Sequence, residues 1–114
     1  MRRGEVWWIN FDPSIGSEIK KKRPAIIVSN NHANDFLTRI QVIPVTSNIA
    51  KLYPSETFIY IKAKKSKALG DQISTVSKLR VGSFICKLSK QEMDDVDKVI
   101  RMQLGLNKEL LKIK

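Results

Sequence analysis

The sequence predicts a mainly β fold, a small and mostly antiparallel β-barrel or half-barrel with one amphipathic helix packed across it. Two observations support this prediction. Short runs rich in β-branched and aromatic residues are separated by clusters of Pro, Gly, Asn and Ser, as in chains of short strands and turns. Apolar residues recur at helical spacing only near the end of the chain. With 114 residues, we expect a single domain over residues 1–114.

Six segments of the chain are predicted to be strands. In order, they are 4–11, 24–30, 39–47, 56–62, 71–76 and 81–89. The segments between them are expected to be long loops at 12–23 and 47–55, a turn with room for one helical turn at 30–38, a lysine-rich turn at 63–70, and a short turn or helix at 77–80. Pro24 suits the first position of its strand, where a missing N–H costs least. The first strand is expected to be mostly buried on both faces. Trp7 and Trp8 point to opposite sides of it, so one tryptophan in the core and the other at a dimer interface is an alternative, with the core the safer interpretation for both.

The helix near the C-terminus has clear start and stop signals. Ser89 followed three residues later by Glu92 is a capping-box pattern, and Gly105 ends the periodic apolar positions. Several acids lie in the first turns, where the helix dipole favours them without any catalytic role. Asn107 is a candidate cap for a last short helix.

The net charge of +10 is the strongest bulk signal. Residues 1–91 hold sixteen Lys or Arg and six Asp or Glu, whereas residues 92–114 hold five of each, so the excess lies in the first part. Such a surface points to a polyanion, with nucleic acid the first candidate, although charge that only maintains solubility is an equal alternative at this point. We expect no signal peptide and no membrane span, and hence a cytoplasmic protein.

Motifs for several classes of chemistry are absent from the sequence. There is no Walker loop, GxGxxG, HExxH or GxSxG, and the acids of residues 1–91 are scattered, so no metal and no cofactor is expected. Cys86 is the single cysteine and is expected to be a small packed residue. His32 is the single histidine and is expected to lie in a solvated loop.

Polar residues at two loop edges remain as candidates for chemistry. Arg23 ends the first long loop, and Thr46, Ser47 and Asn48 lead from the third strand into the second. If the second and third strands pair antiparallel, Arg23 and Thr46 meet at one rim. RNA carries its own nucleophile, the 2′-hydroxyl, so such a site need only orient the phosphate and stabilise its extra charge. A surface phosphate clamp or an ion pair with Glu18 remains open for Arg23, and an ordinary strand position remains open for Thr46.

The chain resembles the MazF/PemK family of toxin endoribonucleases over essentially its whole length. The resemblance rests on motifs in order: RGEV, then GSE, then RP before an apolar strand, then VIPVTSN, GDQISTV and the closing KLSKQEMDDVDKVIRMQLGL. It implies an SH3-like barrel of the CcdB/MazF type and a homodimer. It also implies metal-independent cleavage of single-stranded RNA at a short sequence, leaving a 2′,3′-cyclic phosphate and a 5′-hydroxyl. An acidic, MazE-like antitoxin would inhibit the toxin.

The resemblance also implies roles for individual residues. Arg23 and Thr46 match the catalytic pair of the family. RNA contacts are implied at Gly16, Ser17, Glu18, Asn30, Gln72 and Thr75. Beside these we place four residues in the RNA-binding surface because of their charge or their position at the loop edges: Lys20, Lys21, Ser47 and Asn48. Tyr53 is a candidate base-stacking residue, with a plain loop aromatic as the equal alternative.

Two departures and two rival functions accompany this interpretation. Ile19 and the three lysines 20–22 stand where relatives often have Gln and Gly, and Ser74 stands where Arg or Lys is common. One rival is a non-enzymatic toxin of the CcdB type that poisons DNA gyrase, although the end LLKIK lacks the Trp-Gly-Ile typical of that poison. The other is a passive RNA-binding module. Both rivals use the same fold, so fold alone does not decide between them.

Overall fold

The computed structural model describes residues 1–13, 16 and 21–106. Its elements are β1 (Glu5–Asn10), β2 (Lys22–Ile27), α1 (Asn31–Phe36), β3 (Arg39–Thr46), β4 (Glu56–Ile61), β5 (Lys64–Leu69), the 3-10 turn η1 (Gly70–Gln72), β6 (Ser74–Ser77), the 3-10 turn η2 (Lys78–Arg80), β7 (Val81–Lys87) and α2 (Lys90–Gln103). None of the helices among these described residues has the length and hydrophobicity to cross a membrane.

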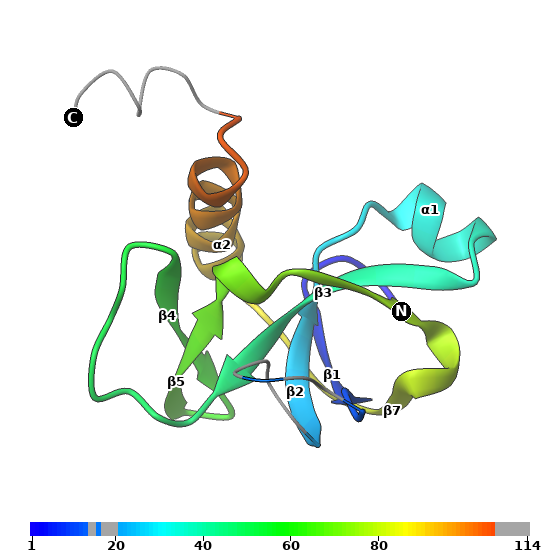
Figure 1. The fold of residues 1–114 in the computed structure, drawn as a ribbon, viewed down its shortest axis with the longest axis horizontal. Coiled ribbons are helices and arrows are strands. Elements are labelled where there is room, and N and C mark those ends of the chain that lie inside the picture. Colours follow the sequence, from blue (N-terminus) through cyan, green and yellow to red (C-terminus); the bar gives the residue numbers. More distant parts are fainter. Residues whose placement is uncertain (14–15, 17–20, 107–114) are drawn as a thin grey trace.

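The strands form one curled, antiparallel sheet, so the predicted half-barrel is confirmed (Figure 1). The strand order is β4-β5-β3-β2-β1-β7, with β6 also paired to β3. Strand β3 is the centre of this arrangement. Along one edge, its first half pairs with β6 and its last two residues, Val45 and Thr46, pair with β5. The other edge of β3 pairs antiparallel with β2, which is the condition for Arg23 and Thr46 to meet at one rim.

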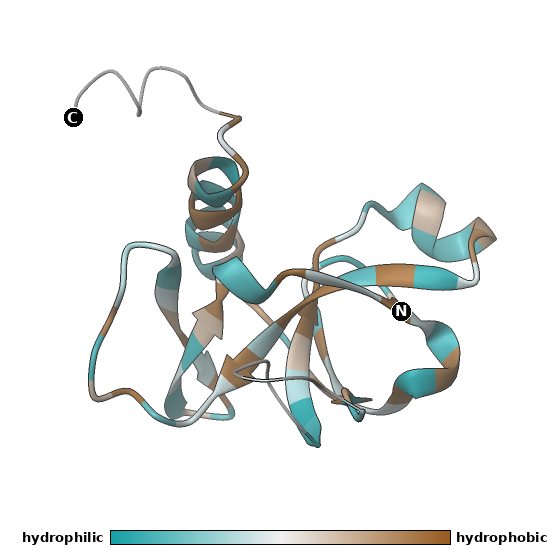
Figure 2. Ribbon diagram, viewed as in Figure 1, coloured by the Kyte–Doolittle hydropathy of each residue, from teal (hydrophilic) through white to brown (hydrophobic). Residues whose placement is uncertain are grey.

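Two apolar clusters fill the two faces of the sheet. The larger cluster includes Val6, Ile26 and Ile43, and α2 covers it with Val96. The smaller cluster is built around Ile9, Ile27, Ile40, Val42, Ala25 and Val76. Successive residues of β2 therefore enter opposite clusters, because side chains alternate across a strand. Helix α2 alternates between hydrophobic and hydrophilic residues as it winds (Figure 2), as expected of a helix with one buried face.

Helix α2 begins as predicted. The Ser89 hydroxyl accepts a hydrogen bond from the Glu92 N–H (3.1 Å), and the Glu92 carboxylate accepts one from the Ser89 N–H (2.9 Å). The same carboxylate also accepts from the Tyr60 N–H of the edge strand β4, at 2.7 Å. The capping box thus fixes the helix to the sheet. The segment after Leu106, including the candidate cap Asn107, lies outside the described residues.

A cluster of paired polar groups, which we call the N-terminal clamp, holds the start of the chain. Arg3 donates from Nε to the Val28 carbonyl (2.9 Å), pairs through Nη2 with Asp97 of α2 (2.5 Å), and donates its N–H to Asn31 Oδ1 (2.7 Å). Gly4 follows with φ +92°, a conformation that strains other residues. The RG of the RGEV motif is therefore explained by structure rather than by chemistry.

The lysine-rich turn predicted at 63–70 is wrong, because most of this segment is strand β5. The Lys67 side chain is buried and pairs with Glu56 at 2.9 Å, and Lys65 Nζ lies 4.1 Å from the centre of the Phe58 ring. Both lysines find partners on the neighbouring strand β4, which offsets the cost of placing charge in a hairpin. Composition alone does not reveal these contacts between β5 and β4.

Smaller corrections concern boundaries and exposure. Strand β2 starts at Lys22, so Pro24 is its third residue and not its first. The strand predicted at 71–76 begins with η1, and only β6 is extended. Trp8 is 42% exposed and is not a core residue, because β1 meets a cleft at this point. His32 is exposed as expected but lies in α1 rather than in a loop, and Cys86 packs against the larger cluster as expected.

Candidate active site

The β2–β3 ladder ends where both strands carry a proline. Its last pair is Ala25 with Pro44, and Pro24 precedes Ala25. Neither proline has an N–H to donate, so the ladder has little reason to continue past them. Beyond this point β3 keeps its pairing with β5 along its other edge, and a cleft opens beside β2 and β3. Two positions beyond this last pair lie Arg23 on β2 and Thr46 on β3, and both line the cleft.

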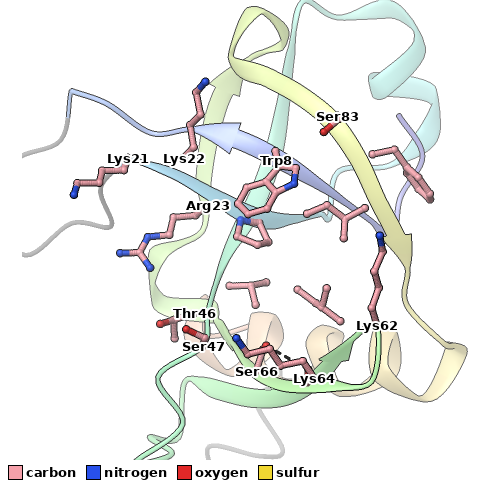
Figure 3. A pocket seen from close by; sticks show the side chains of 15 residues that line it. Trp8, Lys21, Lys22, Arg23, Thr46, Ser47, Lys62, Lys64, Ser66 and Ser83 are labelled. Carbon is pink, nitrogen blue, oxygen red and sulfur yellow. Dashed lines mark hydrogen bonds between the residues drawn. The ribbon is translucent and has the colours of Figure 1, made fainter.

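The cleft has a volume of about 770 Å³. In Figure 3, Arg23 and Thr46 lie on one side of it, Lys62 lies on the other, and Trp8 lies between them. Its lining includes five cations, which are Lys21, Lys22, Arg23, Lys62 and Lys64. None of its described lining residues is an acid. A site of this kind attracts an anionic group and excludes a cationic one.

The Thr46 hydroxyl is held so that it can donate to such an anion. Its oxygen accepts a hydrogen bond from the Asn48 N–H at 3.2 Å, which leaves the hydroxyl proton as the donor. Ser47 lines the cleft beside it. The Asn48 side chain accepts from the Ala50 N–H at 3.2 Å, so this amide stabilises the local turn.

Two residues that the sequence analysis missed fix the loop after Thr46. Lys67 lies directly opposite Thr46 in the β3–β5 register, and it donates to the Lys51 carbonyl at 2.6 Å. Glu56, its ion-pair partner, accepts from the Tyr53 N–H at 3.0 Å. Lys67 Nζ also lies 5.8 Å from the centre of the Tyr53 ring. A buried lysine therefore ties the candidate stacking residue Tyr53, which is 55% exposed, to the strand opposite Thr46.

The ends of the first long loop are tied together as well. The Phe11 N–H donates to the Lys21 carbonyl (2.9 Å), and the Lys21 N–H donates to Asp12 Oδ1 (2.8 Å). Arg80 donates to the carbonyls of Asn10, at 3.0 Å, and of Asp12. These contacts explain why Lys21 and Lys22 reach the cleft. Ser17, Glu18 and Lys20 lie outside the described residues, and Gly16 is exposed.

The remaining predicted RNA contacts lie apart from this cleft. Asn30 lines a second recess of about 490 Å³ with Gln41, and its side chain caps α1 by accepting from the Ala33 N–H at 2.8 Å. Thr75 accepts from Gln41 Nε2 at 3.0 Å, which places it next to the same recess. Gln72 lies in η1. The structure therefore divides the predicted contacts between two places on one protomer.

Two carboxyl groups and one thiol have shifted pKa values. Burial alone raises the pKa of Glu92, but the hydrogen bonds from the backbone of Ser89 and Tyr60 outweigh it and lower that pKa. The pKa of Glu5 is lowered as well. Burial opposes this shift, but the hydrogen bonds donated by the Arg2 backbone and the Trp7 indole outweigh it. Burial raises the pKa of the Cys86 thiol. None of these three groups lines the cleft, so they bear on stability.

Comparison with known proteins agrees with the motifs. Residues 2–104 match the model of the PemK-like, MazF-like toxins of type II toxin–antitoxin systems. Endoribonuclease MazF9 of Mycobacterium tuberculosis is 38% identical over 115 residues, covering 93% of this chain and 98% of that protein. The crystal structure of MazF from Deinococcus radiodurans superposes with a TM-score of 0.82 at 26% identity, covering 92% of this chain and 96% of that one.

A more distant structure shows the same fold. It is an endoribonuclease from a mycobacterial species in complex with its cognate antitoxin, with a TM-score of 0.79, 19% identity, and coverage of 94% of this chain and 97% of that one. The family model and the mycobacterial relative both cover nearly the whole chain. The chain therefore belongs to the PemK-like, MazF-like toxins of type II toxin–antitoxin systems.

Proposed function

We propose that this chain is a toxin endoribonuclease that cleaves single-stranded RNA, including mRNA, at a short sequence and without a metal ion. The observation that carries the proposal is the placement of Arg23 and Thr46 in one cleft lined by five cations. The 38% identical relative is an endoribonuclease, which supports RNA cleavage over gyrase poisoning or passive RNA binding.

The proposed reaction needs no external nucleophile. The 2′-oxygen of the substrate attacks the neighbouring phosphorus, the bond from phosphorus to the 5′-oxygen breaks, and the 5′-oxygen takes up a proton. The products are a 2′,3′-cyclic phosphate and a 5′-hydroxyl. Arg23 would hold two phosphate oxygens at once and stabilise the charge that develops on them, and it is a candidate acid toward the 5′-oxygen. Thr46 would donate a hydrogen bond from its hydroxyl to the same phosphate group.

The proton of the attacking 2′-hydroxyl needs an acceptor. Among the described residues that line the cleft there is neither a carboxylate nor a histidine. Glu18, in the first long loop, is the candidate base from the sequence and lies outside the described residues. A Glu18→Gln variant that cleaves at the wild-type rate would remove it from this role.

The proposal includes two protein partners and a location. Membership of a toxin–antitoxin family supports inhibition by an antitoxin, and solved MazF relatives include MazE–MazF complexes from Deinococcus radiodurans. An acidic antitoxin segment would compete with RNA for a chain of net charge +10. We infer that the working unit is a homodimer in the cytoplasm, since the predicted RNA contacts of one protomer are divided between two recesses.

The test is to incubate the purified protein with a long RNA in EDTA and to map the new 5′ ends. We expect cleavage at one short motif. Arg23→Ala and Thr46→Ala are each expected to lower the rate by roughly 10²- to 10³-fold, since each removes a donor to the developing charge. Lys21→Ala, the matched control in the same cleft, should still cleave. Intact RNA, or cleavage indifferent to Arg23, would exclude this function and leave the binding alternatives.

A further inference from the structure

We propose that the indole of Trp8 stacks on one unpaired nucleobase next to the cleaved phosphate, and that Trp8 thereby holds the RNA at the catalytic pair. This inference rests on the proposed function and concerns a residue outside the catalytic pair. Aromatic side chains bind single-stranded nucleic acid in this way because every base presents a flat π-face.

Trp8 is exposed where its neighbours are not. Val6 and Ile9 on the same strand are fully buried, whereas Trp8 is 42% exposed in the cleft. The adjacent Trp7 has a structural role: its Nε1–H donates to Glu5 at 3.0 Å, and its ring packs edge-on against Phe84 at 5.5 Å. Trp8 has no such hydrogen bond or ring partner within the described residues. An exposed indole with an uncommitted N–H is a common feature of ligand sites.

Trp8 lies near the proposed catalytic arginine, because both residues line the cleft. Trp8 pairs with Pro24 across the β1–β2 ladder, and Arg23 is the next residue along β2. Figure 3 shows the indole between Arg23 and Lys62, facing the space above Thr46. A phosphate held by Arg23 therefore brings one of its two flanking bases close to Trp8. An RNA that reaches the catalytic pair has a base available for stacking.

The rest of the cleft matches the two chemical parts of a nucleotide. Its floor is apolar, formed by the edge of the larger core cluster at Val45, Ile61 and Ile85, and Pro24, the register partner of Trp8, also lines it. Its rim is cationic. A base is flat and largely apolar on its faces, and its phosphate is anionic, so one nucleotide satisfies both parts at once. A volume of about 770 Å³ lies within the usual range for sites of small ligands.

The test combines a protein change with the matching change in the RNA. Short RNAs containing the mapped cleavage motif are made with a single abasic nucleotide at each position in turn. Trp8→Ala is expected to lower kcat/KM on intact RNA by roughly 5- to 150-fold, mainly through KM, because it removes one stacking contact. Trp8→Phe should restore most of the loss. One abasic position should cause a similar loss in the wild type and little further loss in Trp8→Ala, since both changes remove the same contact.

A control and four contrary outcomes keep the inference separable from the proposed function. Tyr60→Ala removes an aromatic that is 54% exposed and does not line the cleft, and it should leave the cleavage profile unchanged. The inference fails if Trp8→Ala keeps the wild-type rate and motif, if its loss adds to that of every abasic position, or if only kcat falls. It also fails if Trp8→Ala weakens the binding of an antitoxin while RNA cleavage is unaffected, because the group that contacts Trp8 in the cleft is then a protein side chain.

If the wild type cuts no RNA, the proposed function fails and the inference is tested by binding. In a Trp7→Phe chain the remaining indole is Trp8, and its fluorescence reports on the cleft. Single-stranded oligouridylate or oligoadenylate should quench this signal, and the matching abasic sugar-phosphate chain should not. Equal responses to the two probes would overturn the stacking inference.

Discussion

The N-terminal clamp and the cleft both centre on an arginine, but the described charged residues that surround the two arginines differ. In the clamp, the side chain of Arg3 is bound by a carbonyl and by the Asp97 carboxylate, so the charge is neutralised inside the fold. In the cleft, Arg23 shares its surroundings with four lysines and, among the described lining residues, no acid. Opposite charges placed together stabilise a fold, whereas like charges around an apolar floor cost stability and imply an anionic ligand.

This contrast predicts that cleft substitutions change the reaction and clamp substitutions change stability. The largest effect is expected for Thr46→Val, which keeps the shape of the side chain and removes the hydroxyl. Because one donor to the transition state is lost, the cleavage rate should fall by roughly 10²-fold or more while the thermal midpoint stays close to that of the wild type. Single-turnover cleavage and thermal unfolding measure the two quantities. Thr46→Ser should recover most of the rate, and a variant that is simply unfolded would contradict the assignment.

The clamp is expected to give the reverse result. Arg3→Ala leaves the Asp97 carboxylate and the Val28 carbonyl without this partner, so the free energy of unfolding should fall by roughly 2–3 kcal/mol. Arg3 lines the second recess and not the cleft, so the cleavage rate per folded molecule at saturating RNA should be unchanged, whereas the RNA concentration needed for saturation reports on any contact at that recess. Denaturant unfolding and single-turnover cleavage below the midpoint measure the two effects. A folded Arg3→Ala protein with a large loss of rate would place the clamp in the reaction.

A smaller effect, and a dependence on pH, are expected at the other end of α2. Folding lowers the pKa of Glu92 from its ordinary value of 4.5. As the pH falls, the Glu92 carboxylate therefore takes up a proton in the unfolded chain before it does so in the folded protein. The stabilisation from Glu92 is complete above its ordinary pKa and is lost as the pH falls through its lowered, folded-state pKa. Glu92→Gln should cost about 1 kcal/mol near pH 7 and flatten the acid dependence. Unfolding measured from pH 7 to pH 2 checks this, and the remaining slope should reflect Glu5, whose pKa is also lowered. An unchanged slope in Glu92→Gln would refute the assignment.

The sequence was sufficient for the parts of the fold that local patterns determine. Ser89 and Glu92 predicted the start of α2, because a capping box is encoded within four residues. The shared rim of Arg23 and Thr46 followed from the sequence once an antiparallel pairing of β2 and β3 was assumed, and the structure has that pairing. These inferences needed only neighbours in sequence or in one strand pair.

Features that depend on distant partners could not be predicted in this way. Three lysines within 64–67 indicated a turn, and only Glu56 and Phe58 on the paired strand show why they belong to β5. Trp8 was expected in the core because it follows a buried pattern, and its exposure comes from the opening of the cleft beyond two prolines.

The smallest expected effect distinguishes the cations of the cleft from the catalytic arginine. Lys62 lies across the cleft from Arg23 (Figure 3), and we expect it to attract the phosphate backbone of RNA by its charge. Lys62→Ala should therefore weaken RNA binding a few-fold at low salt and reduce the slope of log K against log salt by about 0.7, the value for one phosphate of a single strand. Binding titrations from 50 to 200 mM salt, with the Arg23→Ala background used to prevent cleavage, measure this slope. Lys98→Ala, on α2 and away from the cleft, should leave it unchanged. If the Lys62 variant lost affinity equally at all salt concentrations, the lysine would be a specific contact, and the division between attracting and reacting cations would have to be redrawn.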